Sequence, residues 1–422
     1  MKLSELCPVD LPPADLPVEV IIGPGAHTEL ADVSSRHLGE NPLILADSDT
    51  WTAAGEPALQ GELMLLQRHP HADDATVQQV LEAIDGHDGV IAIGSGTIND
   101  LAKRAAHLAQ VPYVVLGTAA SMNGYASGIA AILSHGLKTT VPARPPMAIV
   151  LDTEILAAAP ARLTQAGLGD LMSKPVSDSD WWLANQLEGT GYSELPSQIV
   201  DHAVEAAITA ASGLARRDAA AHGALGAALV LSGVAMVVAG SSSPASGGEH
   251  LLSHLWDMER LAEGHETRLH GAQVGVTTCI TAALYQRLIS METVSLPEPP
   301  PWAAEQARLE NEHGTLASVV IPQAKKKYDR LRARAEVLRE KWSEIRAGLE
   351  QRSLPTSDTI RAALAAAGAP STLVALDEPR ANATRVFRLA RDIRDRVTVL
   401  DLAFEVGVLP RDISTILDDA GV

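Results

Sequence analysis

The chain has little cysteine, few aromatic residues and a deficit of positive charge. Its 422 residues include only Cys7 and Cys279 as cysteines, too few for a disulfide framework or a four-thiolate zinc site. Aromatic residues make up 3%, so Ala, Val, Leu and Ile must form the core. The net charge is −19, whereas nucleic acids and anionic membranes bind positive surfaces. These counts favour a reduced, cytoplasmic globular protein with neither nucleic acid nor membrane as a partner.

Long apolar runs are also scarce. One segment, Gly223–Gly240, has 18 residues without a charge, which is the lower limit for a helix that crosses a membrane. Most of the run is Ala and Gly, and no basic flank follows it. We therefore expect a buried core helix rather than a membrane span. The N-terminus lacks the apolar stretch of a signal peptide.

In the first 158 residues, short apolar strands alternate with helical patterns. Helices are expected at 74–83 and 99–109. The expected strands are Val18–Ile22, Pro42–Ala46, Leu63–Leu66, Gly89–Ile93, Val111–Leu116 and Ala148–Leu151. This alternation is typical of a mostly parallel sheet covered by helices on both faces. We predict an α/β, Rossmann-like domain over residues 1–158.

Beyond about Pro160 the pattern becomes helical. The expected helices are 179–190, 197–217, 219–239, 248–262, 270–290, 303–313 and 322–350, with a loop at 294–301. The last helix contains three consecutive lysines, 325–327, for which a solvated face is expected. We predict an all-helical domain over residues 159–422, with a cleft between the two domains.

A glycine turn follows the strand Gly89–Ile93. Gly94-Ser95-Gly96 leads into a helix, and glycines let the backbone approach a pyrophosphate at the positive end of that helix. This favours a dinucleotide phosphate site, although an ordinary turn fits the same residues. Asp47 follows another strand, where a carboxylate can accept both ribose hydroxyls and would repel a 2′-phosphate, so NAD is favoured over NADP. A turn-capping aspartate is equally compatible.

Three histidines lie close together in the sequence. Ser246 and Glu249 have the spacing of a capping box, which places His250 in the first turn of a helix and His254 on the same face. His270 opens the next helix. Asp170 lies in a Gly-Leu-Gly-Asp run that we interpret as a tight turn leading into a helix. A carboxylate with two imidazoles can hold a catalytic divalent metal, whereas histidines on a solvated face are the alternative.

Several motifs together resemble a known family. They are IGSGTINDLAK (93–103), GTAASMNGYAS (117–127), AGLGDLMSK (166–174) followed by Asp180-Trp181, PASGGEHLLSH (244–254), LHGAQVGV (269–276) and RDRVTVLDLA (394–403). In this order they resemble the sn-glycerol-1-phosphate dehydrogenase branch of a superfamily. That superfamily includes iron-containing alcohol dehydrogenases, glycerol dehydrogenases and dehydroquinate synthases. The resemblance extends from about residue 15 to residue 410.

The resemblance implies specific site residues. Asp170, His250 and His270 would be the metal ligands, and His254 a proton-relay residue. Asn123 and Lys174 are further candidates for the catalytic site. The implied cofactor-binding residues are Asp47, Gly94, Ser95, Gly96, Thr97, Asp100, Thr118 and Ser121.

Some positions separate the branches of the superfamily. Lys174 stands where iron-type alcohol dehydrogenases carry a histidine ligand, which indicates three protein ligands. Asp170 and Lys103 replace a glutamate and a glycine typical of dehydroquinate synthases. Ser243 stands where many archaeal relatives have arginine. The residues that bind the substrate phosphate are therefore not identified by the resemblance, and Lys174 is a candidate.

The expected reaction is metal-dependent, NAD(P)H-linked reduction of dihydroxyacetone phosphate to sn-glycerol 1-phosphate in the interdomain cleft. The ligand set does not choose between zinc, nickel and iron. Alternatives are a dehydrogenase of another small polyol such as glycerol, a lyase or cyclase of the dehydroquinate synthase kind with bound NAD, and a non-catalytic descendant. The relatives make a homo-oligomer, a dimer or larger, the expected assembly.

Overall fold

The computed structural model describes residues 3–422, except 8, 13, 135–136 and 353. The chain forms two compact units. The first comprises the chain up to Leu171 with Leu195–Ser241 and Ala366–Gly368, and the second comprises Met172–Glu194, Ser242–Ala365 and Ala369–Val422. This division differs from the predicted boundary at residue 158, because the helix at Ala219–Ala239, beyond that point, packs against the sheet.

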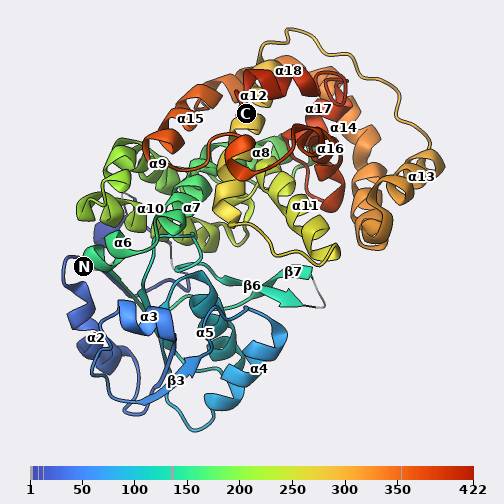
Figure 1. Ribbon diagram of the computed structural model, residues 1–422. Coiled ribbons are helices and arrows are strands. Elements are labelled where there is room, and N and C mark those ends of the chain that lie inside the picture. Colours follow the sequence, from blue (N-terminus) through green and yellow to red (C-terminus); the bar gives the residue numbers. More distant parts are fainter. Residues whose placement is uncertain (1–2, 8, 13, 135–136, 353) are drawn as a thin grey trace. The chain divides into compact units, whose positions relative to one another are not determined.

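The first unit contains a six-stranded sheet with the order β1-β8-β5-β4-β2-β3 (Figure 1). Its strands are β1 (Glu19–Gly23), β2 (Leu43–Asp47), β3 (Glu62–Leu66), β4 (Val90–Gly94), β5 (Tyr113–Gly117) and β8 (Ala148–Asp152). Every neighbouring pair in this sheet is parallel. The predicted parallel sheet is confirmed, and each predicted strand lies within two residues of the observed one.

The inner strands are apolar because helices cover both of their faces. Every residue of β2, β4, β5 and β8 is buried. Alternate residues such as Ile91 and Ile93 pack with Leu30 and Val33 of α2 (Leu30–His37). Since successive strand residues point to opposite faces, α5 (Gly96–Ala109), which also packs on β4, covers the other face.

A β-hairpin between β5 and β8 was not predicted. Its strands are β6 (Ile129–Ser134) and β7 (Leu137–Pro142), which pair antiparallel. The burial of β6 alternates instead of running continuously, so this strand has no apolar run like those of the main sheet. Asp100 of α5 accepts a hydrogen bond from the backbone N–H of Ala131 at 3.1 Å, which ties the hairpin to that helix.

The apolar run at 223–240 forms a core helix, as predicted. Helix α10 (Ala219–Ala239) is long and apolar enough to cross a membrane, with a mean hydropathy of 1.9, but 78% of its apolar window is buried within the protein. It packs against α6 (Thr153–Ala158), β1 and β8. A side chain at Gly223 would lie 2.8 Å from the Thr153 methyl group. The helix therefore belongs to the same unit as the sheet.

Helix prediction was accurate where periodicity was strong. Helix α4 (Asp74–Ala83), α10 and α11 (Gly248–Ala262) have the predicted bounds. Helix α5 begins at Gly96, three residues earlier than predicted. Other helices agree within a few residues: α8 (Lys174–Glu188), α9 (Glu194–Ala215), α12 (His270–Ile289), α13 (Trp302–His313) and α14 (Ala317–Gln351). Further helices were not predicted: α3 (Ser48–Ala53), α6, α7 (Ala161–Met172), α15 (Ser357–Ala366), α16 (Arg380–Leu389), α17 (Val399–Glu405) and α18 (Ile413–Asp419).

The lysine run of α14 is not uniformly solvated. The side chains of Lys325 and Lys326 are 42% and 59% exposed, as expected for a solvated face. Lys327 is buried, and its Nζ lies 2.7 Å from Oδ1 of Asp401. The prediction for Lys327 was wrong because the third lysine lies on the inward face of the helix, where Asp401 pairs with it.

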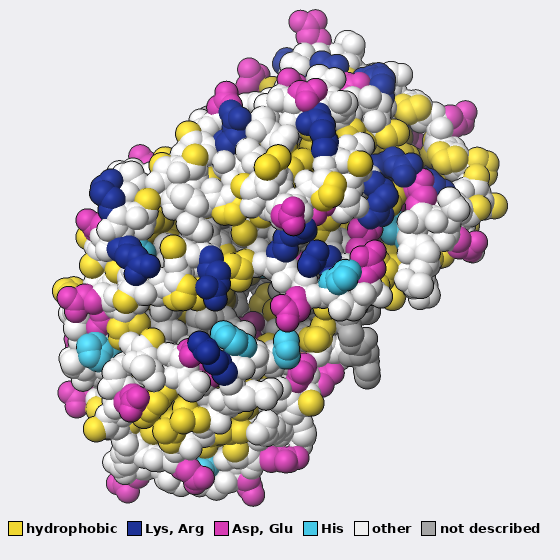
Figure 2. Space-filling model, viewed as in Figure 1, with side chains coloured by type: hydrophobic (Ala, Val, Ile, Leu, Met, Phe, Trp, Pro, Cys, Tyr) yellow, Lys and Arg dark blue, Asp and Glu magenta, His cyan; other side chains and the backbone are white. Residues whose placement is uncertain are grey.

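The surface carries both signs of charge despite the net charge of −19. Residues 302–422 contain 19 of the 33 Lys and Arg residues and 18 of the 52 Asp and Glu residues. Figure 2 shows basic and acidic side chains interspersed on the face that it presents. The negative charge of the chain therefore comes from its first 301 residues.

Candidate functional site

The glycine turn of the first unit joins β4 to α5. A side chain at Gly94 would lie 2.5 Å from Cβ of Ile98, so this position requires glycine, whereas one at Gly96 would have 3.4 Å to Met122. Ser95 is the N-cap of α5 and makes no side-chain capping bond. The first amides of a helix lack partners within the helix. This turn can therefore present N–H donors to a phosphate, and Thr97 lies in the same first turn.

The next loop lies against the glycine turn. The N–H of Thr118 donates to the carbonyl of Gly94 at 3.1 Å. Behind it, the buried Lys103 donates to Oγ of Ser127 at 3.1 Å and to the carbonyls of Ile129, at 3.0 Å, and Gly124. Burial lowers the pKa of Lys103, and the neighbouring Asp100 opposes that shift. Lys103 thus stabilises the loop that carries Ser121 and Asn123, a role that sequence reasoning missed.

Asp47 is the last residue of β2 and also caps a helix. Its Oδ1 accepts from the N–H of Thr50 at 2.9 Å, and the Thr50 hydroxyl accepts from the N–H of Asp47 at 3.1 Å, so the two form a capping box at α3. Within the described part of the chain, Oδ2 of Asp47 accepts no hydrogen bond. The capping role and a ribose contact are therefore compatible.

Asp170 does not lie in a turn, contrary to prediction. It is in the last turn of α7, which runs without a break through both glycines of the Gly-Leu-Gly-Asp run. A side chain at Gly167 would collide with the carbonyl oxygen of Ala120. The glycine is needed because the helix packs against the backbone of the loop. Oδ2 of Asp170 accepts from the N–H of Asn123 at 3.3 Å.

Three histidines of the second unit cluster as the sequence predicts. His250 and His254 lie on α11, and His270 is the first residue of α12. The ring centroids of His250 and His270 are 5.1 Å apart, and those of His254 and His270 are 5.4 Å apart. Asp170, His250 and His270 each offer one ligand atom, and these atoms all lie within 4.8 Å of one another.

Hydrogen bonds to Nδ1 orient two of these rings. Nδ1 of His250 lies 2.7 Å from Oε1 of the buried Glu249, and Nδ1 of His270 lies 3.4 Å from the Ser253 hydroxyl. In metal sites the second ring nitrogen of a ligand histidine is usually held in this way. The donor set of one carboxylate and two imidazoles fits a divalent metal. Glu249 was not predicted to take part, although it directly precedes His250.

The start of α11 differs from the predicted capping box. The N-cap is Gly247, and it makes no side-chain cap. Oε1 of Glu249 accepts from the N–H of Gly247 and from the Ser177 hydroxyl, both at 2.7 Å. Asp180 accepts from the N–H of Gly248 at 2.6 Å and from the Tyr285 hydroxyl at 2.5 Å. Two buried carboxylates from α8 and α11 thus replace the expected serine cap.

The pKa values of these two carboxylates shift in opposite directions. Burial and the nearby Glu249 raise the pKa of Asp180 to about 7, against the opposing hydrogen bond from Tyr285. Burial also acts on Glu249, but hydrogen bonds and attraction from His250 outweigh it and lower the pKa of Glu249. Glu249 is therefore an anion that fixes the His250 ring.

Lys174 is fully buried at the start of α8. Its Nζ donates to the carbonyl of Ala245 at 3.0 Å and to the Ser173 hydroxyl at 3.2 Å. These bonds hold the segment that precedes α11 and its histidines. They give this lysine a structural role beside the predicted metal ligands.

The fold and the glycine turn define a class of protein. A family described as iron-containing alcohol dehydrogenase matches residues 21–160, which span the sheet. A probable glycerol dehydrogenase from Sinorhizobium meliloti superposes with a TM-score of 0.66 at 18% identity, over 96% of this chain and 98% of that one. Maleylacetate reductase from Agrobacterium tumefaciens gives 0.61 at 16% identity, over 94% and 98%. These structures share the fold, as predicted.

Closer relatives narrow the class. A glycerol-1-phosphate dehydrogenase from Bacillus velezensis is 32% identical over 296 residues, which cover 67% of this chain and 75% of the relative. One from Thermococcus sibiricus is 36% identical over 281 residues, covering 64% and 78%. Both are named as NAD(P)+ enzymes. The chain belongs to the glycerol-1-phosphate dehydrogenase family, which confirms the predicted resemblance.

Proposed function

We propose that the chain catalyses the NAD(P)H-linked, metal-dependent reduction of dihydroxyacetone phosphate to sn-glycerol 1-phosphate. The observation that carries this proposal is the gathering of Asp170, His250 and His270, with ligand atoms within 4.8 Å, in a member of this family. When bound, a divalent metal would polarise the substrate carbonyl, and the reduced nicotinamide would supply a hydride.

Each protein residue then has a defined task. Glu249 holds Nδ1 of His250, so Nε2 is the ring nitrogen that would hold a metal. His254 lies beside both other rings, with centroids 5.8 Å from His250 and 5.4 Å from His270. This place supports a role for His254 in supplying the proton that the product hydroxyl requires. Asn123 donates its N–H to Asp170 and so orients the third ligand.

The cofactor would lie at the carboxyl ends of the parallel strands, where ligands bind in such sheets. The turn at Gly94–Gly96 offers the phosphate donors, and Thr118, hydrogen-bonded to Gly94, joins the two loops at this edge. The uncommitted Oδ2 of Asp47 supports a contact with the adenosine ribose. We therefore propose NADH as the preferred cofactor. Asp47→Ser should raise kcat/KM with NADPH relative to NADH, because the carboxylate that would repel a 2′-phosphate is removed.

The test follows NADH oxidation with dihydroxyacetone phosphate on protein stripped with EDTA, before and after addition of zinc, nickel or iron. Turnover should depend on one of these metals and fall at least about a thousandfold in His270→Ala and Asp170→Ala, because the polarising charge is lost. His265→Ala is the matched control, since His265 lies in the same connection between α11 and α12 and is 62% exposed. Metal content measured by mass spectrometry should be lower in His270→Ala and Asp170→Ala, and unchanged in His265→Ala.

Other results would change the proposal. Turnover of glycerol or another polyol with NAD, but not of the phosphate ester, would keep the chemistry and change the substrate. Absence of net NADH consumption with every ketone tested would reject the dehydrogenase and favour a cyclase with tightly bound NAD.

A further inference from the structure

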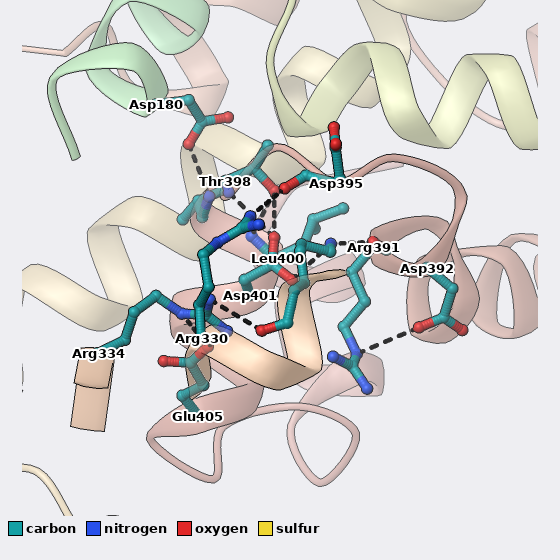
Figure 3. A network of polar contacts seen from close by, with 12 residues as sticks. Asp180, Arg330, Arg334, Arg391, Asp392, Asp395, Thr398, Leu400, Asp401 and Glu405 are labelled. Carbon is teal, nitrogen blue, oxygen red and sulfur yellow. Dashed lines mark hydrogen bonds and ion pairs between the residues drawn. The ribbon is translucent and has the colours of Figure 1, made fainter. Parts of the chain in front are cut away.

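A short segment of the second unit, residues 394–398, is fixed at both ends. It connects a 3-10 turn at Ala390–Ile393 to α17. Arg330 of α14 donates to the carbonyl of Asp395 at 2.6 Å, and Asp180 accepts from the N–H of Val399 at 2.6 Å. Figure 3 shows these contacts converging on the start of α17 from different helices. The backbone of the segment is therefore held in one conformation.

Arg396 lies in the middle of this segment, and its charge is not paired. Among the residues that the structure describes, its one hydrogen bond runs from Nη2 to the Ser246 hydroxyl at 3.3 Å, and no carboxylate lies within 4.0 Å. A guanidinium has five N–H donors, so most of its donors lack a protein partner. By contrast, Arg330 pairs with Glu188 at 2.9 Å.

The side chain is half-buried. Burial lowers the pKa of Arg396, and the carboxylates of Glu249 and Asp180 only partly oppose this shift. Those carboxylates are already bonded to other donors: Asp180 to Gly248, Tyr285 and Val399, and Glu249 to Gly247, Ser177 and His250. Arg396 is therefore not needed as a hydrogen-bond partner for Asp180 and Glu249, and those carboxylates do not explain why most of its N–H donors lack a protein partner.

The position of Arg396 relates it to the histidine cluster. Ser246, which it contacts, directly precedes Gly247, whose N–H donates to Oε1 of Glu249 at 2.7 Å; the same oxygen lies 2.7 Å from Nδ1 of His250. A side chain at Gly247 would lie 2.5 Å from Oδ2 of Asp180. The Asp180 carboxylate occupies the space that a side chain at Gly247 would need, so this glycine lets α8 approach the start of α11 beside Ser246.

We propose that Arg396, together with the Ser246 hydroxyl, binds the phosphate group of the substrate while the carbonyl end lies at the histidine cluster. This inference rests on the proposed function. Arginine presents a planar fork of donors that matches phosphate oxygens and forms charge-assisted hydrogen bonds. The fixed backbone at 394–398 would hold that fork in place before substrate binds, which reduces the entropy lost on binding. Arg396 is then the residue that distinguishes a phosphorylated ketone from an unphosphorylated one.

The test compares Arg396→Gln with Arg394→Gln, a control in the same segment whose side chain is exposed. With NADH and the metal-loaded enzyme, Arg396→Gln should raise KM for dihydroxyacetone phosphate about 10- to 100-fold. Its kcat/KM for unphosphorylated dihydroxyacetone should change less than about twofold. Arg394→Gln should match the wild type on both substrates. Calorimetric titration of the metal-free, cofactor-free protein with inorganic phosphate should show binding that Arg396→Gln abolishes.

Equal losses on both substrates, with phosphate binding retained, would overturn the inference and make Arg396 a structural residue. If Arg396→Gln fails to fold, Arg396→Lys keeps the charge without the fork and should give an intermediate KM; an unchanged KM would reject the inference. A wild type that reduces no phosphorylated ketone would instead reject the proposed function. The phosphate titration would still decide whether Arg396 forms an anion site.

Discussion

The two units differ in how they bury polar groups. In the first unit the inner strands of the sheet are apolar, and polar side chains such as Asp47 and Thr118 lie where strands end. In the second unit, whole ion pairs lie inside. Arg334 is 2% exposed and contacts both Glu405 and Glu188 at 2.6 Å. One unit is stabilised by a sheet between helices, and the other depends on charges that meet inside a helical core.

This contrast explains where sequence reasoning succeeds. A buried strand is a local feature, because five consecutive apolar residues reveal it. A buried ion pair is not local: Arg334 and Glu188 are separated by 146 residues, and each alone looks like a surface residue. The sequence therefore predicts that the second unit is helical, but it does not reveal the ion pairs buried inside that unit.

The largest effect is expected from breaking the buried pairs of the second unit. Arg334→Ala removes the ion-pair partner of Glu405 and leaves Glu188 with Arg330 alone, and burial already raises the pKa of Glu405. Loss of one partner of a buried pair costs about 3–5 kcal/mol. Arg332→Ala, exposed on the same helix, should cost less than about 0.5 kcal/mol. Urea denaturation of both variants measures the difference, and equal costs would show that the network contributes nothing specific.

In the first unit the matching change is Ile91→Ala in the central strand β4. Ile91 is fully buried. The variant therefore buries less apolar surface and leaves a cavity, which should lower the free energy of unfolding by about 3 kcal/mol. Leu63→Ala on the edge strand β3, where the side chain is 39% exposed, should cost less than about 1 kcal/mol. A comparable loss at both positions would contradict the view that the inner strands carry the stability of this unit.

Much of the fold could be predicted from the sequence, in proportion to how local each signal is. The parallel strands and the helices α10 and α11 follow from runs and periodicity. The interpretation of Gly167 and Gly169 as a turn failed, because glycine also serves close packing inside a helix, and only the neighbouring backbone of Ala120 reveals this. The predicted cap at Ser246 failed because Asp180, distant in sequence, satisfies the first amides of α11.

The candidate site was predicted unevenly for the same reason. Asp170 and the histidines carry a recognisable spacing and motif context. Glu249 and Arg396 are visible only through their partners in space, His250 and Ser246. Residues that orient or complement a site have no spacing of their own, so the sequence alone does not reveal them.

A smaller effect, dependent on pH, tests the charged core again. Burial favours the neutral form of Asp392, but Arg391, His313 and Arg308 outweigh it and lower its pKa to about 2. The carboxylate then stabilises the fold by about 2 kcal/mol at neutral pH. Because the native pKa lies below the unfolded value, this stabilisation is present above about pH 4 and is lost as the pH falls toward 2.

Asp392→Asn should therefore be less stable than the wild type at pH 7, with a difference that narrows as the pH approaches 3. Chemical denaturation at several pH values measures this. A difference that is independent of pH would show that Asp392 contributes through packing rather than through its charge.

The smallest effect is expected for an exposed pair of the first unit. Arg36 and Glu19 lie 2.9 Å apart, with Arg36 49% exposed. Such pairs contribute about 0–1 kcal/mol. Arg36→Ala should lower the free energy of unfolding by no more than about 0.5 kcal/mol, and molar salt should remove the difference. A loss as large as that of Arg334→Ala would remove the distinction between surface and interior pairs.

Gly167 has no side chain, yet its close contact with the loop at Ala120 can set the position of the Asp170 carboxylate in the candidate metal site. It brings α7 directly onto the loop at Ala120, and the same helix and loop carry Asp170 and Asn123, which are hydrogen-bonded to each other. Any larger side chain at this position would push helix and loop apart and shift the Asp170 carboxylate, without changing the identity of any proposed ligand. Selection for a different metal could therefore act on the spacing set by position 167 and leave the proposed ligands unchanged.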